Sequence, residues 1–150
     1  MADFGQRDSR TRFAHTSVLA DAACAAHLRQ EFSVWLRRWF SLDPRRVSDM
    51  VLAVNEALAN AAEFAYSAVE HSGAMHLRAD YDTGSAVLTV TVTDEGAWRL
   101  KDAANEHVSR GRGIPLMRAL ADRATIDSTP AGTRVCLEWN HVAAAQSAVT

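Results

Sequence analysis

The sequence has few cysteines, no long apolar run and no concentration of positive charge. Its two cysteines, Cys24 and Cys136, form no CxxC pair, which favours reduced thiols over a disulfide. No apolar stretch is long enough to cross a membrane, and the polar N-terminus lacks the apolar core of a signal peptide. The net charge is −2 at pH 7 and no basic run stands out. We therefore expect a cytoplasmic protein that binds neither a membrane nor nucleic acid directly.

Several common catalytic motifs are also missing. The six histidines have no metal-ligand spacing, and no GxSxG sequence marks a nucleophile elbow. The GK[ST] end of a P-loop is absent, and the glycines near residue 111 do not complete the dinucleotide-binding pattern. These absences disfavour zinc enzymes, α/β-hydrolases, P-loop NTPases and dinucleotide-dependent enzymes.

The length of 150 residues and the hydrophobic content of 48% fit one globular domain. We expect flexible tails at 1–11 and 141–150 and a folded domain at 12–140. The predicted elements are, in order, a strand at 12–19, helices at 19–40 and 44–68, strands at 74–81 and 86–94, a short helix at 114–122, and strands at 123–128 and 133–139. Apolar and polar residues alternate in the strands, so one sheet face is wet and the helices cover the other. This pattern predicts a two-layer α/β sandwich with a mixed, mostly antiparallel sheet.

The stretch NEALANAAEFAY (55–66) carries two polar side chains one helical turn apart, Glu56 and Asn60. They are expected to point away from the apolar stripe of the helix, and Ala53, Ala57 and Ala59 are expected to leave room beside them. One interpretation is an ordinary solvated face. The other is a metal or phosphate site, because hard cations such as Mg²⁺ prefer amide and carboxylate oxygens.

Two later stretches are also candidates. In VTVTDEGAW (90–98) a strand ends in Asp94, whose carboxylate can accept hydrogen bonds from a planar ring, and Gly96 allows close approach to the backbone. In SRGRGIPLM (109–117) two glycines lead into a helix start, where free N–H groups and the helix dipole suit phosphate. Each stretch is also compatible with a simple turn or connection.

Taken together, these stretches resemble the GHKL ATP-binding domains, named for gyrase, Hsp90, histidine kinases and MutL. Within this group the chain looks most like the compact anti-sigma factor serine/threonine kinases of actinobacteria. NEALANAAEFAY resembles the N box, VTDEGAW and RGRGIPLMRALAD the two glycine boxes, and AGTRVCLEW the closing strand. The resemblance spans roughly residues 12–139 and implies the Bergerat-type ATP-binding fold.

The resemblance also implies roles for single residues. Asn60 would ligate Mg²⁺ at the ATP phosphates, and Glu56 would be the general base toward a substrate serine. Asp94 would accept a hydrogen bond from the adenine amino group. Gly96 would let the adenine ring approach the backbone, and Thr133 would complete the adenine end.

The second glycine box would hold the phosphates. Gly111 and Gly113 would cradle them at the helix start, beneath a lid formed by residues 97–112. Either Arg110 or Arg112 would face the phosphates, and the sequence does not choose between them.

Three functions follow from these features. The first is an ATP-dependent serine kinase that phosphorylates an anti-anti-sigma factor protein and sequesters a sigma factor, as a homodimer by resemblance. The second is a non-catalytic module that binds nucleotide and acts only by sequestration. The third, a histidine-phosphorylating sensor fragment, is disfavoured because no upstream helix carries a suitable histidine.

Overall fold

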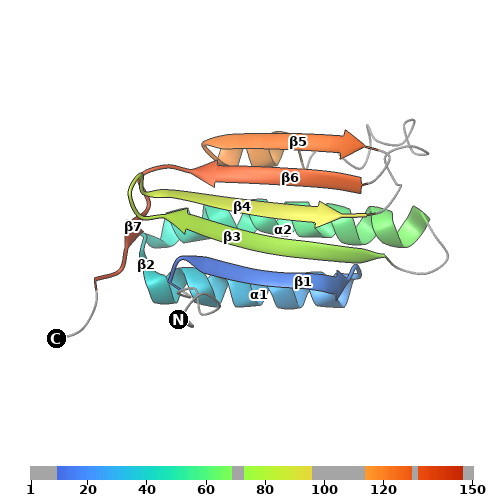
Figure 1. Ribbon diagram of the computed structural model, residues 1–150, viewed down its shortest axis with the longest axis horizontal. Helices are drawn as coiled ribbons and strands as arrows, with labels where there is room; N and C mark the ends of the chain where they lie inside the picture. Colours follow the sequence, from blue (N-terminus) through green and yellow to red (C-terminus); the bar gives the residue numbers. More distant parts are fainter. Residues whose placement is uncertain (1–9, 69–72, 96–113, 130–131, 147–150) are drawn as a thin grey trace, which may run out of the picture.

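A computed structural model of the chain describes residues 10–68, 73–95, 114–129 and 132–146. In order, these residues form β1 (Arg12–Leu19), α1 (Ala22–Trp39), β2 (Phe40–Ser41), α2 (Pro44–Ala68), β3 (Ala74–Asp82), β4 (Val87–Asp94), a short helix at residues 114–120, β5 (Arg123–Thr129), β6 (Gly132–Trp139) and β7 (Ala143–Ala144). Figure 1 shows α1 and α2 in a layer behind the main sheet. The predicted two-layer α/β sandwich is therefore confirmed.

The main sheet has five strands in the order β1-β3-β4-β6-β5. Every strand pairing in the described ranges is antiparallel. The connection from β4 to β5 passes through the short helix at 114–120, and it crosses β6 to reach the sheet edge. This order brings the end of β4 beside the start of β6.

The strands bury one face, as the alternation predicts. On β3 and β4 the buried apolar side chains are Met75, Leu77, Ala79, Tyr81, Leu88, Val90 and Val92. Both helices pack on this face through their apolar stripes, which include the fully buried Phe32, Met50 and Leu58. Within the described part of the chain, neither helix is long and apolar enough to span a membrane.

The two helices begin at carboxylate caps. Asp21 accepts a hydrogen bond from the backbone N–H of Cys24 at 2.8 Å. Asp43 accepts one from the N–H of Arg46 at 2.9 Å, and Pro44 occupies the first helical position as expected. The first helix begins at Ala22 rather than at residue 19 because β1 extends to Leu19 and the cap follows it.

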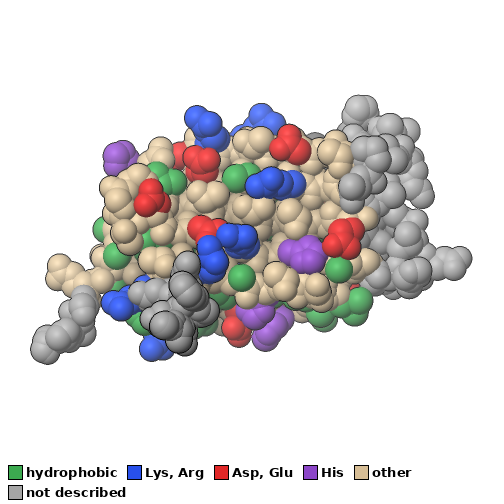
Figure 2. Space-filling model, viewed as in Figure 1, with side chains coloured by type: hydrophobic (Ala, Val, Ile, Leu, Met, Phe, Trp, Pro, Cys, Tyr) green, Lys and Arg blue, Asp and Glu red, His purple; other side chains and the backbone are tan. Residues whose placement is uncertain are grey.

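The other face of the main sheet carries polar side chains. Figure 2 shows this face, with charged side chains at its centre. Asp80 receives hydrogen bonds from Arg12 at 3.0 Å and from Arg78 at 2.8 Å. The Nε2 atom of His76 lies 3.0 Å from the Oε2 atom of Glu95. Cys24 and Cys136 are free thiols, in agreement with the sequence.

The segment after β6 packs on the domain, although it falls within the expected C-terminal tail. Val142 is fully buried, and its carbonyl oxygen accepts a hydrogen bond from the Tyr81 hydroxyl at 2.6 Å. The two residues of β7 pair with β2. Tertiary contacts thus hold residues 142–144 in place beyond the predicted domain limit.

Candidate functional site

Asn60 lies at the edge of the hydrophobic core. Its side chain lines a small cavity between α2 and the sheet, together with Ala57 and Ala61 of the same helix. Asn60 is half-buried. The expectation that the Asn60 side chain points opposite to the apolar stripe was therefore wrong. The buried stripe of α2 is wide and includes Ala57 and Ala61, which line the same cavity as Asn60.

Glu56 precedes Asn60 by one turn of α2, so the two side chains are neighbours on the helix surface. It is half-buried, one turn before Asn60, and does not line the cavity that Asn60 borders. The periodicity of α2 places Glu56 in an outward stripe with Leu52, Ala59 and Glu63, at spacings of four, three and four residues. Glu56 and Asn60 thus lie one turn apart on α2, with Asn60 on the side nearer to the sheet.

The three alanines beside these residues do not behave alike. Ala53 and Ala57 are buried, with exposed fractions of 0% and 1%, whereas Ala59 is exposed. The expectation that all three leave open space was wrong for Ala53 and Ala57. Their small size instead lets α2 approach the sheet closely, which brings Asn60 near the strand ends.

Asp94 and Thr133 form the sheet side of the site. Asp94 ends β4 and pairs directly with Thr133 of β6. Both side chains are buried, with exposed fractions of 5% and 4%. They follow the inward alternation of Val92 and Val135, so they face α2 as the apolar residues do. The sheet therefore presents a carboxylate and a hydroxyl to the cavity that Asn60 lines.

The cavity itself is small. Its volume of about 10 Å³ is roughly the room of one water molecule. Ile114 and Met117 of the short helix and Ile126 of β5 line it with the polar groups. An aromatic ring needs more room than this cavity offers.

Gly132 fixes the backbone around Asp94. Its φ of +154° lies in a region that residues with a side chain rarely adopt. A Cβ atom at this position would stand 2.0 Å from the carbonyl oxygen of Asp94 and 3.1 Å from Cα of Glu95. Only glycine allows β6 to start this close to the end of β4.

Ser128 is a polar neighbour that sequence reasoning missed. Its hydroxyl oxygen lies 3.5 Å from that of Thr133, which it opposes across the β5–β6 hairpin. The turn at TPAG, which joins the two strands, is the one sequence signal for this pairing. It predicts a hairpin but does not fix the register.

The remaining predicted residues lie outside the described ranges. These are Gly96, Arg110, Gly111, Arg112 and Gly113. Of the predicted site residues that are described, the structure brings together Asn60, Asp94 and Thr133. Glu56 lies one turn before Asn60 on α2 and does not line the cavity.

The chemistry of these groups suits a planar ligand with a donor edge. A buried carboxylate accepts hydrogen bonds from ring N–H groups, and a hydroxyl can donate or accept beside it. The apolar side chains around them suit the two faces of a ring. The donor and acceptor set therefore fits the amino edge of adenine, once the cavity widens.

Comparisons with known proteins identify the family and the fold of the chain. The sequence matches the family of histidine kinase-like ATPase domains over residues 18–139, so the chain belongs to this family. Membership of an ATPase family implies that the domain binds ATP.

A solved structure has the same fold. It is the crystal structure of the RsbU and RsbW domains of Rv1364c from Mycobacterium tuberculosis, with a TM-score of 0.68 and 21% identity. The match covers 93% of this chain and 34% of that chain, and it establishes the fold alone. No curated protein matches the sequence.

Proposed function

We propose that this chain is an ATP-dependent serine/threonine kinase that phosphorylates an anti-anti-sigma factor protein on serine and sequesters a sigma factor. The observation that carries the proposal is the buried Asp94–Thr133 pair facing Asn60 of α2. In a histidine kinase-like ATPase domain this arrangement supports an adenine end at the sheet and a phosphate end along the helix.

The adenine end rests on Asp94 and Thr133. The Asp94 carboxylate would accept a hydrogen bond from the adenine amino group, and the Thr133 hydroxyl would complete the contact. Gly132 lets the backbone of β6 lie close to the backbone of Asp94. The proposed role of Gly96 is to let the ring approach the backbone.

The phosphate end rests on Asn60. The described residues contain no cluster of three or more His, Cys, Asp or Glu side chains that could hold a metal ion. In this proposal Asn60 would hold Mg²⁺ together with phosphate oxygens and water, as Mg²⁺ usually is held at nucleotide sites. The ion, when bound, supplies charge neutralisation for phosphoryl transfer. Gly111 and Gly113, with Arg110 or Arg112, are proposed to cradle the phosphates.

Glu56 is the proposed general base. It lies one turn from Asn60, on the outward side of α2, where a protein substrate can reach it. A carboxylate at this position can take the proton from a serine hydroxyl as the phosphoryl group arrives. Its place outside the cavity separates proton transfer from nucleotide binding.

The proposed partners are the sigma factor, the anti-anti-sigma substrate and a second copy of the chain, all acting in the cytoplasm. A non-catalytic binding module is the second candidate. The observation that favours it is the small size of the cavity, because a site that opens too little for ATP cannot turn over.

The test is phosphate transfer from labelled ATP in the presence of Mg²⁺, with the anti-anti-sigma proteins of the same genome as acceptors. We expect Glu56→Gln to lower the transfer rate by about 10²-fold or more while ATP affinity stays unchanged. Glu138→Gln is the matched control, since Glu138 is half-buried on β6 and lies away from the cavity.

The outcomes separate the candidates. ATP binding by the wild type without transfer to any acceptor would favour the binding module. A folded wild type that binds no ATP at millimolar concentration would refute the kinase function and leave a module that acts only by binding protein partners.

A further inference from the structure

A hollow lies on the exposed side of the helical layer, between α1 and the first half of α2, and its volume is about 230 Å³. We call it the arginine hollow. It is lined by Arg29, Ser33 and Arg37 of α1 and by Val47, Ser48, Val51, Leu52 and Asn55 of α2. None of these residues lines the cavity of Asn60, Asp94 and Thr133, so the two sites are separate.

The side chains around the arginine hollow carry positive charge. Two arginines line it, whereas no aspartate or glutamate does. Within the described ranges, neither Arg29 nor Arg37 forms an ion pair with a carboxylate. Arg29 is also half-buried, and a partly buried charge without a partner is unfavourable. The two guanidinium groups therefore favour an anionic ligand in the hollow.

Ser33 lies between the two arginines on the same side of α1, one helical turn from each. Only 7% of this residue is exposed, and it lines the hollow. No residue in the described part of the chain forms a hydrogen bond with the Ser33 hydroxyl. Buried polar groups normally have a hydrogen-bond partner. A ligand in the hollow would supply the partner that this hydroxyl lacks.

The α2 side of the arginine hollow is mainly apolar. Val47 is buried, Val51 is half-buried and Leu52 is 41% exposed. The hydroxyl of Ser48 and the amide of Asn55 add two uncharged polar groups. The hollow thus combines hydrogen-bond donors of α1 with an apolar wall of α2, which is the usual composition of a site for a small organic ligand.

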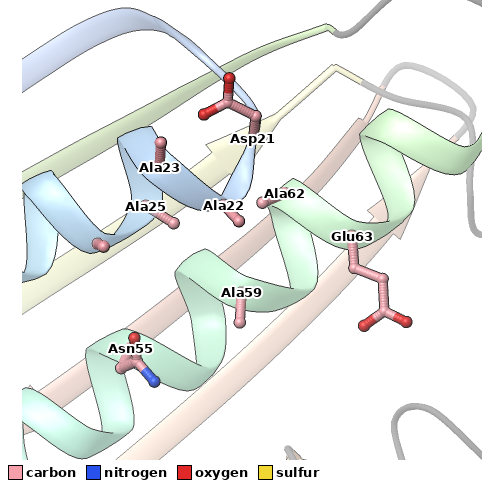
Figure 3. Close-up of a pocket in the computed structure, with 9 residues that line it drawn as sticks. Asp21, Ala22, Ala23, Ala25, Asn55, Ala59, Ala62 and Glu63 are labelled. Atoms are coloured by element: carbon pink, nitrogen blue, oxygen red, sulfur yellow. The ribbon is translucent and has the colours of Figure 1, made fainter.

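A larger hollow of about 690 Å³ adjoins the arginine hollow, and Asn55 lines both. Figure 3 shows this neighbour between the start of α1 and the middle of α2, with alanines on both helices. Asp21 and Glu63 border it with their carboxylates. Because carboxylates repel an anion, the larger hollow does not compete for the ligand that the arginines favour.

We propose that the arginine hollow binds a small organic anion, which carries a phosphate or carboxylate group beside a compact apolar part. Arg29 and Arg37 pair with the oxyanion through their forked donors, and the Ser33 hydroxyl donates to the same group. The apolar part packs against Val51 and Leu52. This binding does not depend on the proposed kinase function, because the hollow shares no residue with the nucleotide cavity.

The dimensions of the arginine hollow limit the ligand. Sites for drug-sized ligands measure about 300–1,000 Å³, so a hollow of about 230 Å³ takes a smaller molecule. Arg29 and Arg37 are eight residues apart on α1, which is about 12 Å along the helix axis. Ser33 stands midway, about 6 Å from each along this axis, so both long side chains can reach one oxyanion beside its hydroxyl. We expect a dissociation constant of about 1 mM or lower.

The test is a titration of the full chain with phenyl phosphate at constant ionic strength, followed through the backbone amide signals in NMR spectra. The amides of Ser33 and Asn55 are expected to shift, while those of Asp94 and Thr133 are expected to stay in place. Inorganic phosphate lacks the apolar part and is expected to bind more weakly, and phenol lacks the charge and is expected not to bind. Benzoate, which carries a carboxylate on the same ring, shows which of the two anionic groups the hollow prefers.

Variants at the arginine hollow separate binding from folding. Arg37→Ala is expected to weaken the binding of phenyl phosphate about tenfold, and Ser33→Ala about threefold or more. Ser33→Ala is not expected to reduce stability in urea, because the lost hydroxyl has no partner in the described part of the fold. Arg38→Ala is the matched control, since Arg38 is the next residue of α1 and its Cζ atom lies 4.9 Å from the centroid of the Trp39 ring, outside the hollow. It is expected to bind phenyl phosphate as the wild type does.

Two results would overturn the proposal. One is a folded wild type in which phenyl phosphate and benzoate, at up to about 10 mM, leave the amides of Ser33 and Asn55 unshifted. The other is equal binding by Arg37→Ala and Arg38→Ala, which would show only a general attraction of anions to a positively charged surface. Neither result bears on the kinase function, which is tested by ATP binding and phosphate transfer.

Discussion

Asp94 and Thr133 lie directly opposite each other on neighbouring strands, and both side chains are buried on the face of the sheet that α2 covers. The apolar side chains of Val92, Val135 and Met117 line the same cavity as this pair. The carboxylate and the hydroxyl thus form the polar edge of a cavity that Asn60 lines from the helix.

Asp94→Asn keeps the shape of the side chain but replaces one acceptor oxygen with a donor. We expect ATP affinity to fall by about 10- to 100-fold, because a hydrogen bond to a charged acceptor is worth about 1.5–3 kcal/mol. Calorimetry with and without Mg²⁺ measures the change. Asp127→Asn, on the exposed part of β5, is the control. Equal ATP affinity of the wild type and Asp94→Asn would contradict the assignment of the adenine end.

Much of this site could be predicted from the sequence. Strand alternation through Leu88, Val90 and Val92 extends to Asp94 and predicts an inward side chain. Helical spacing correctly placed Asn60 one turn after Glu56. The direction of Asn60 could not be predicted, because it depends on how α2 rests on the sheet, and that is decided by packing between distant elements.

The register of the strands and the close contacts between distant segments could not be predicted from the sequence for the same reason. The pairing of Asp94 with Thr133 joins residues from two strands separated by a long connection, and no local signal sets it. The burial of Val142 in the expected tail likewise depends on the distant Tyr81. The narrow cavity follows from side chains of several elements, and no single motif encodes it.

Gly132→Ala is expected to destabilise the domain. The added Cβ would stand 2.0 Å from the Asp94 carbonyl oxygen, so the strand must shift, at a cost of about 2 kcal/mol or more. Urea unfolding measures the loss. Gly84→Ala is the matched control, because its Cβ would meet only the Asp82 carboxylate at an ordinary 3.7 Å. Equal stability of the two variants would show that the contact at Gly132 relaxes freely.

Arg46→Ala tests the contact between α2 and the chain after β6. The guanidinium donates to the carbonyl oxygens of Asn140 at 2.5 Å and His141 at 3.0 Å, and it lies 3.5 Å from Asp122. Its loss is expected to lower the free energy of unfolding by about 1–2 kcal/mol. The neighbouring exposed Arg45, changed to Ala, is expected to have an effect below about 0.5 kcal/mol. Matching thermal unfolding curves for the two variants would contradict the role of Arg46.

The carboxylate of Asp82 makes the free energy of unfolding depend slightly on pH in the acid range. The Asp82 carboxylate accepts a hydrogen bond from the Ser85 hydroxyl at 2.7 Å and another from the backbone N–H of Gly84 at 3.2 Å. These two hydrogen bonds hold the pKa of Asp82 below its usual value. A lowered pKa in the folded state stabilises the fold fully above the unfolded pKa of about 3.9, and this contribution is lost as the pH falls through the folded value. Asp82→Asn removes the titrating group. The difference in unfolding free energy between the wild type and Asp82→Asn is therefore expected to be constant from pH 7 to about pH 5 and to shrink below about pH 4. Unfolding curves at each pH measure it, and a difference that stays constant down to pH 2 would contradict the lowered pKa.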